Sequence, residues 1–157
     1  MSRAAVRMLY ADRVTPWPAA GRDVKFPQVV VCAFDEWVAN QIRDLVAEQK
    51  WLLREVRQPA AALELVREPR PGVLLIQADP TGDATAPLGL LADAHRLCPD
   101  VGTVVVSDAK LADDDRAAWT AAAFDLGARA VLFPPLTRPV VEDAVSGLMA
   151  AAVRRGG

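Results

Sequence analysis

Several kinds of residue are scarce in this chain of 157 residues, and each scarcity excludes a class of protein. Two cysteines and one histidine are too few for paired-cysteine or histidine-cluster sites, so neither a metal nor another cofactor is expected. No apolar run approaches the roughly 18 residues of a membrane-spanning helix. The N-terminus also lacks the continuous apolar segment and small-residue cleavage site of a secretory signal. A cytoplasmic protein that does not insert into membranes is therefore expected.

Strong positive charge and glycine-rich loops are missing as well. The formal net charge is −2 and no basic stripe occurs, which argues against nucleic acid as a direct partner. No glycine-rich phosphate loop is present. His95 lies in a helical stretch without a nearby nucleophile motif, which favours a solvated side chain. Cys32 lies in an apolar run and Cys98 just after a helical segment, so two reduced, unlinked thiols are expected.

Five short apolar runs recur along the chain, each followed by a stretch with helical spacing. The runs cover residues 29–32, 51–56, 73–78, 103–106 and 130–133. Because they are continuous rather than alternating, they are typical of parallel strands that are buried on both faces. The composition, 52% apolar and 24% charged, is that of a globular domain with a substantial core. The pattern predicts one α/β domain.

The segments between these runs show recognisable helix ends. Asp35 is a natural N-cap for the first helix, whose apolar stripe leaves Trp37 pointing away from the core. Gly127 is expected to stop the fourth helix. The remaining helices are expected from Pro59, over residues 87–97 and 113–126, and after Thr137.

Two local motifs refine this reading. Ser107 ends the fourth run in Val-Val-Val-Ser-Asp-Ala, and Gly127-Ala128 lead through the fifth run to Pro134-Pro135. With the five βα units, these features resemble the receiver domain of bacterial response regulators over about residues 28–155. The resemblance implies a flavodoxin-like, doubly wound sheet of five parallel strands in the order 2-1-3-4-5 with helices on both faces. It divides the chain into an N-terminal extension, 1–27, and a domain, 28–157.

The residues that would accept a phosphoryl group depart from the family pattern. In receivers the third strand ends in the acceptor aspartate, and here the matching residue is Gln77, whose carboxamide cannot form an acyl phosphate. Two acidic residues normally hold Mg²⁺ after the first strand, whereas Ala33 and Phe34 offer no side-chain oxygen. Ser107 matches the conserved hydroxyl, but Pro134 replaces the lysine of a Lys-Pro pair that commonly has a cis bond. The chain thus resembles a degenerate pseudo-receiver and is not expected to be an enzyme.

Two alternatives stay open at the carboxyl edge of the sheet. Asp35, Asp79 and Asp108 lie near strand ends and could form a residual acidic site for a displaced phosphoacceptor or a small hydrolase, although each also fits an ordinary turn or cap. A small polar ligand held by Gln77 and Ser107 would instead make the chain a sensor.

A protein partner or a second copy of the chain is the other expectation. Receivers commonly signal through the fourth helix, fifth strand and fifth helix, where this chain has Trp119, Val131 at the aromatic switch position and Ala151 in a helix rich in small residues. Trp119 also fits simple packing on the sheet. The resemblance implies a phosphorylation-independent interaction or signalling adaptor in a bacterial regulatory or assembly system, acting as a dimer or docked subunit.

The N-terminal extension differs in character from the domain. Residues 1–28 hold five basic and two acidic side chains, a balance of plus 3. Trp17 stands between two prolines, which favour an extended backbone, and an exposed indole ring is suited to a partner's pocket. The segment is therefore interpreted as partner-binding, against the alternatives of a leader or a segment packed on its own domain.

Overall fold

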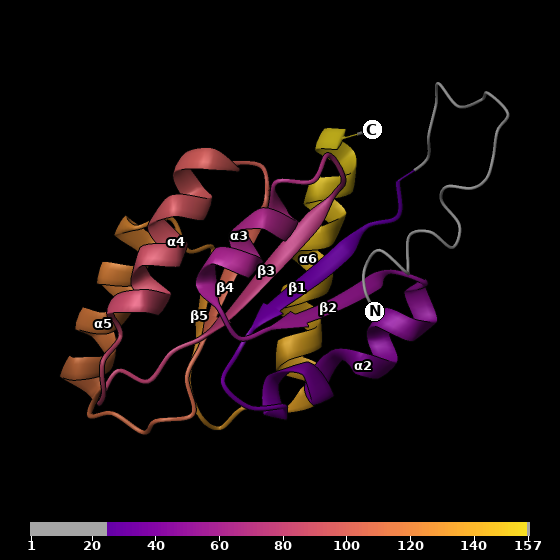
Figure 1. Ribbon diagram of the computed structural model, residues 1–157. Coiled ribbons are helices and arrows are strands. Elements are labelled where there is room, and N and C mark those ends of the chain that lie inside the picture. Colours follow the sequence, from indigo (N-terminus) through magenta and orange to yellow (C-terminus); the bar gives the residue numbers. More distant parts are fainter. Residues whose placement is uncertain (1–24, 157) are drawn as a thin grey trace, which may run out of the picture.

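Five parallel strands form the centre of the protein, whose computed structural model describes residues 25–156 (Figure 1). The strands are β1 (Gln28–Cys32), β2 (Leu52–Val56), β3 (Gly72–Gln77), β4 (Gly102–Val106) and β5 (Ala130–Leu132). They lie in the order β2-β1-β3-β4-β5, and every neighbouring pair is parallel. The fold class and strand order expected from the sequence are confirmed.

A helix follows each strand, and the first four helices return the chain to the start of the next strand. The helices are α2 (Trp37–Gln49), α3 (Pro59–Val66), α4 (Thr85–Leu97), α5 (Asp113–Asp125) and α6 (Arg138–Gly156). The third helix of the domain begins at Thr85, two residues before the expected start, because Asp83 Oδ1 accepts the Thr85 N–H at 2.9 Å. Gly127 follows α5 with a φ of +115°, which agrees with its expected role as a helix stop.

The pleat of the sheet separates two apolar layers. Alternate strand residues face α2 and α6, and the others face α3, α4 and α5. The first set is Val29, Val31, Val73, Leu75, Val104 and Val106, and the second is Val30, Cys32, Leu74, Ile76 and Val105. Since β1, β3 and β4 are buried on both faces, their apolar runs are continuous, as expected for a parallel sheet.

The position of one aromatic side chain was predicted wrongly. Trp37 is half-buried and packs against the layer between the sheet and α2. It was expected to point away because it lies off the apolar stripe of its helix. As the first residue of α2, however, it lies where the chain leaves the sheet and can still reach the core.

The remaining fold observations concern membranes and thiols. Within residues 25–156, no helix combines the length and apolarity needed to cross a bilayer. Cys32 and Cys98 are both free thiols, in agreement with the expectation, and burial raises the pKa of Cys32.

Candidate functional site

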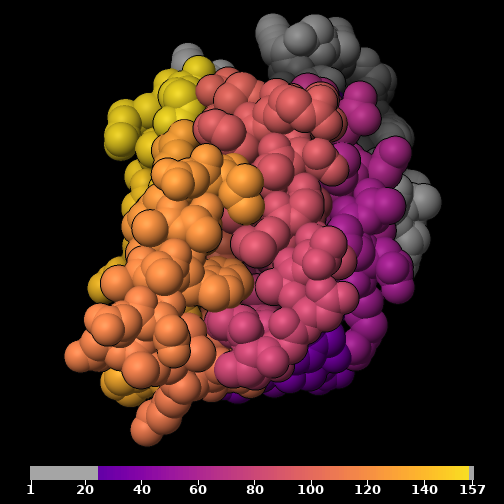
Figure 2. Space-filling view, turned by 90° about the vertical axis from the view of Figure 1, so that its left-hand side faces the viewer, coloured from indigo at the N-terminus to yellow at the C-terminus, as the bar shows by residue number. Residues whose placement is uncertain are grey.

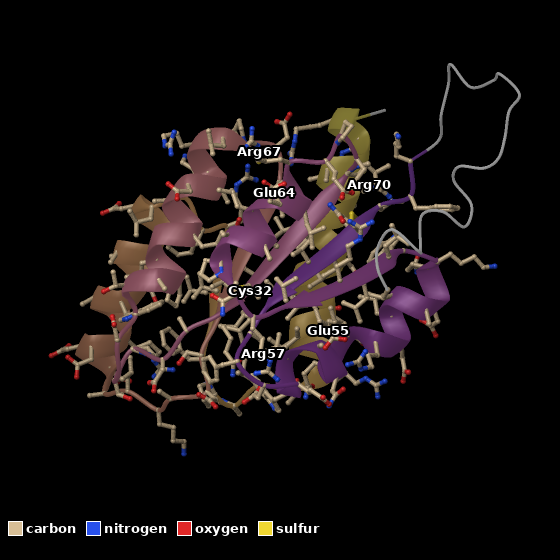
Figure 3. The ribbon with its side chains drawn as sticks, viewed as in Figure 1. Cys32, Glu55, Arg57, Glu64, Arg67 and Arg70 are labelled. Carbon is tan, nitrogen blue, oxygen red and sulfur yellow. The ribbon has the colours of Figure 1, made fainter. Side chains whose placement is uncertain are left out.

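The carboxyl ends of the strands bring together the residues that the resemblance singled out. Gln77 is the last residue of β3, and the sheet register aligns it with Val106 of β4, so Ser107 follows directly beside it. Cys32 at the end of β1 aligns with Ile76, which places Ala33 and Phe34 on the other side of Gln77. This edge lies at the lower end of the sheet in Figure 3, where Glu55 and Arg57 are labelled.

The Gln77 carboxamide is a buried link between two strands. Its side chain is 2% exposed, and Oε1 accepts the Phe34 N–H at 3.0 Å. Because a backbone N–H can only donate, this bond fixes which end of the amide faces Phe34. The Nε2 group is buried and has no hydrogen-bond partner among the described residues. A neutral side chain therefore holds the loop after β1 from the end of β3.

Arg57 holds the same loop from the other side, and the sequence analysis missed it. It follows β2, and its Nη1 donates to the Phe34 carbonyl oxygen. The N–H and C=O of Phe34 are thus both engaged, by Gln77 and Arg57 respectively. A small cavity of about 150 Å³ lies beside this contact, between Asp35 and Glu55. The sequence did contain a clue to this role. Arg57 directly follows the second strand, just as Ala78 directly follows the third, so both residues lie at the carboxyl edge of the sheet.

The other residues at this edge are apolar or engaged in local bonds. Ser107 is fully buried, and its Oγ accepts the Ala109 N–H at 3.0 Å, which closes a local turn. Ala33 is buried, and the Phe34 side chain is 53% exposed. The bond between Pro134 and Pro135 is cis, as the resemblance implied, and Pro134 has no backbone donor.

The three aspartates serve local turns or lie in solvent. Asp35 accepts the Trp37 N–H at 3.0 Å, just ahead of α2. Asp79 accepts the Thr81 hydroxyl at 2.6 Å and its N–H at 3.0 Å, and these bonds lower the pKa of Asp79. Asp108 is exposed. Across residues 25–156, no three acidic, histidine or cysteine side chains are grouped so that they could hold a metal ion.

The aromatic residues near β5 form a second contact that sequence reasoning missed. Trp119 is half-buried, and its ring meets Phe133 edge-to-face at 6.3 Å between centroids. The Arg116 guanidinium lies 6.0 Å from the centre of the same Phe133 ring. Val131 is half-buried in β5 and pairs with Val105. Phe133 thus interacts with two side chains of α5. The sequence indicated its importance only through its position, directly after β5 and before Pro134.

The outer surfaces of α5 and α6 carry exposed apolar side chains. Figure 2 shows the surface of α5 (orange) beside that of α4 (salmon), with the C-terminal end of α6 (yellow) at their edge. Phe124 of α5 is 47% exposed, and Val140 and Val153 of α6 are 42% and 43% exposed. Ala151 is half-buried, whereas its neighbour Ala150 is exposed. Trp17 lies outside the described residues.

Comparisons with known proteins give the fold. No family model matches the sequence, and no curated protein matches it either. A CheY-like receiver domain protein from Methanospirillum hungatei is 11% identical, with a TM-score of 0.61 over 83% of this chain and 99% of that chain. The signal receiver domain of a LuxO-type repressor protein from Vibrio parahaemolyticus is 14% identical, with a TM-score of 0.63 over 83% of this chain and 95% of that chain. An uncharacterised protein from Neptuniibacter caesariensis is 18% identical, with a TM-score of 0.64 over 83% of this chain and 91% of that chain.

These likenesses establish the architecture alone, because the sequence identities are low. The chain has the flavodoxin-like fold of response-regulator receiver domains. What the site does must be argued from its own residues.

Proposed function

We propose that this chain is a receiver-like interaction module that takes up no phosphoryl group and acts through protein contacts in a bacterial regulatory or assembly system. In this role the chain would bind other proteins and would not catalyse a reaction. The observation that carries the proposal is the buried hydrogen bond from the Phe34 N–H to Gln77 Oε1 at 3.0 Å.

The chemistry of the site supports the loss of phosphoryl transfer. An amide oxygen of Gln77 is a poor nucleophile and cannot give the stable acyl phosphate that an aspartate gives. The Ala33 and Phe34 side chains supply no oxygen for Mg²⁺, which prefers carboxylate and water ligands. Pro134 supplies no positive charge to balance a phosphoryl group.

The geometry also supports a fixed rather than a switched conformation. In a phosphorylated site, a new anion would draw loop donors toward it and so move the loops. Here the Phe34 N–H is already engaged by Gln77 and the Phe34 carbonyl by Arg57. Ser107 Oγ is engaged by the Ala109 N–H. The loops are therefore held without a phosphoryl group, so we propose that the signalling surface is always in one state.

Incubation with acetyl phosphate and Mg²⁺ should leave the mass of the intact protein unchanged, because neither an acceptor nor a metal site is present. Intact-protein mass spectrometry is the measurement, with an active receiver domain as the positive control. Gln77→Asp should also stay unmodified, since Ala33, Phe34 and Pro134 remain. A stable gain of one phosphoryl group on Asp79 would overturn the proposal.

One observation favours a second candidate, a sensor of a small polar molecule at the same edge. Gln77 Nε2 is a buried donor without a partner among the described residues, and the Ser107 hydroxyl lies directly after the adjacent strand β4. Two such donors suit an acceptor oxygen of a carboxylate or a similar group. A rise of the unfolding midpoint with added acetate, absent in Gln77→Leu, would favour the sensor over the permanently fixed module.

We further propose that a protein partner or a second copy of the chain binds the face formed by α5, β5 and α6, with Trp17 of the N-terminal extension as an additional contact. Exposed Phe124 and Val140 support this face. Large apolar side chains of this kind contribute to binding when a partner covers them. The inward packing of Trp119 on Phe133 assigns that indole ring mainly to the fold.

Phe124→Glu or Val140→Glu should reduce assembly at least tenfold, because either change buries a charge in the proposed interface. Light scattering of the full chain at micromolar concentration, and capture of partners, would measure the effect. Ala47→Glu on α2 is the matched control, since Ala47 is an exposed helical residue away from this face. If both variants assemble as the control does, the interface lies elsewhere.

A further inference from the structure

A second, larger cavity lies at the amino edge of the sheet, at the opposite end from Gln77. Its volume is about 730 Å³, within the range of small-molecule sites. The α3–β3 loop, the α4–β4 loop and the end of α6 form its walls. In Figure 3 the labels of Arg67 and Arg70 mark this end of the sheet, and those of Glu55 and Arg57 mark the other.

Much of the cavity wall is apolar. Leu97 and Val153 face it and are each 43% exposed. Val66 and Val101 add further aliphatic surface, and the other apolar lining residues are Pro69, Pro71, Pro99 and Ala152. Exposed aliphatic surface gathered in a concave site favours a ligand with an apolar body.

The two acidic side chains in the cavity wall are paired with arginines. Glu68 is paired with Arg54 at 2.7 Å and with Arg70 at 3.1 Å. Arg155 donates to the Asp100 carbonyl at 2.7 Å and also lies 3.6 Å from the Asp100 carboxylate. The negative ends of α3, α4 and α6 all lie here and would disfavour an anion if no cations balanced them.

Arg67 is a further cation in the cavity wall. It caps the C-terminus of α3 and lines the cavity, and within residues 25–156 no hydrogen bond or ion pair engages its guanidinium. It lies close to Cys98 in the same wall: burial raises the pKa of the Cys98 thiol, and the charge of Arg67 lowers it by a smaller amount. Solvation at a helix end would account for an exposed arginine, but not for the apolar cavity beside it.

We propose that this cavity binds a small organic acid with a single anionic group, whose carboxylate meets Arg67 while its apolar body lies against Leu97, Val101 and Val153. A guanidinium binds a carboxylate through two parallel hydrogen bonds, which orients the ligand. Four basic side chains line the cavity against two acidic ones, so the excess of positive charge suits an anionic ligand and the aliphatic wall suits its apolar body. The proposal is independent of the function assigned to the carboxyl edge.

The thiol of Cys98 provides the measurement on the full 157-residue chain. Decanoate serves as the probe, and the alkylation of Cys98 by N-ethylmaleimide is followed by intact mass. Cys32 is only 7% exposed, so Cys98 is the thiol expected to react. Decanoate should slow the alkylation in a saturable way, and 1-decanol, which has the same chain without the charge, should protect at least tenfold less well.

Arg67→Gln should weaken the protection by decanoate about tenfold and leave the weak effect of 1-decanol unchanged. Arg96→Gln is the matched control, because Arg96 is exposed on α4, pairs with Asp93 and does not line the cavity. Protection midpoints are compared rather than rates, because the charge of Arg67 also affects the thiol itself. Calorimetric titration of the same proteins provides an independent affinity, and unfolding curves check that each variant is folded.

Three results would overturn the proposal. One is the absence of saturable binding of decanoate, and another is equal binding by the wild type and Arg67→Gln. The third is a Cys98 thiol that resists alkylation in the native protein without added acid but reacts in urea, because the cavity would then be covered by the chain itself.

Discussion

Gly127→Ala is expected to destabilise the fold by about 2–4 kcal/mol, combining a strained backbone with a side-chain clash. Gly127 has a φ of +115°, which residues with a side chain rarely adopt. A Cβ added there would lie 2.4 Å from Cγ and 2.5 Å from Cβ of His95. These atoms are next to the His95 backbone and cannot swing away freely. Urea unfolding followed by circular dichroism would measure the loss.

The chain provides a matched control with the opposite expected sign. Gly147 lies in α6, and a Cβ added there would meet no atom within 4 Å. Gly147→Ala should therefore stabilise the protein by about 0.5–1 kcal/mol, since glycine loses more backbone entropy in a helix. Adding His95→Ala to Gly127→Ala should recover only the part of the loss due to the contacts with the imidazole ring, because the His95 Cβ at 2.5 Å and the backbone strain both remain. If Gly127→Ala is as stable as the wild type, the left-handed turn is not needed.

Gln77→Ala is expected to lower the free energy of unfolding by about 3 kcal/mol, because it removes the bond to Phe34 and opens a cavity in a buried site. Gln77→Leu keeps most of the volume and should lose only about 1–2 kcal/mol, the cost of leaving the Phe34 N–H without its acceptor. In both variants, amide hydrogen exchange at Phe34 should become faster. Denaturant unfolding and exchange measured by NMR would give the two effects separately.

The leucine variant is the decisive member of this pair. It also removes the buried Nε2 donor that has no partner among the described residues, which is a gain that opposes the lost bond. If Gln77→Leu proves as stable as the wild type and exchange at Phe34 is unchanged, Gln77 does not hold the loop. The proposal of a permanently fixed site would then fail even if the protein is never phosphorylated.

The sequence by itself determined the elements and their approximate bounds. Five runs became five parallel strands. Those of β1, β3 and β4 are largely apolar because these strands are covered on both faces, whereas the run of the edge strand β2 includes Arg54 and Glu55. Gly127 marked the end of α5, since a left-handed turn requires glycine there. Gln77 was placed at the end of β3 by counting along the strand, and the structure has it there. Each of these features depends on local pattern.

Only the tertiary structure decided how residues distant in sequence meet. Gln77 and Phe34 are 43 positions apart, and Arg57 and Phe34 are 23 apart, so no local pattern connects them. The strand order brings the ends of β1, β2 and β3 together at one edge. Which side chains form hydrogen bonds there depends on their distances and on the donors and acceptors they carry.

The same limit applies to the cavity beside Arg67. Its walls come from two loops and a helix end that the sheet order gathers at the amino edge, and each segment alone has only the composition of an ordinary loop or helix end. A concave surface depends on how separate segments are spaced in three dimensions. Residue types along the chain specify which groups are available, whereas packing against the sheet decides which of them share a cavity.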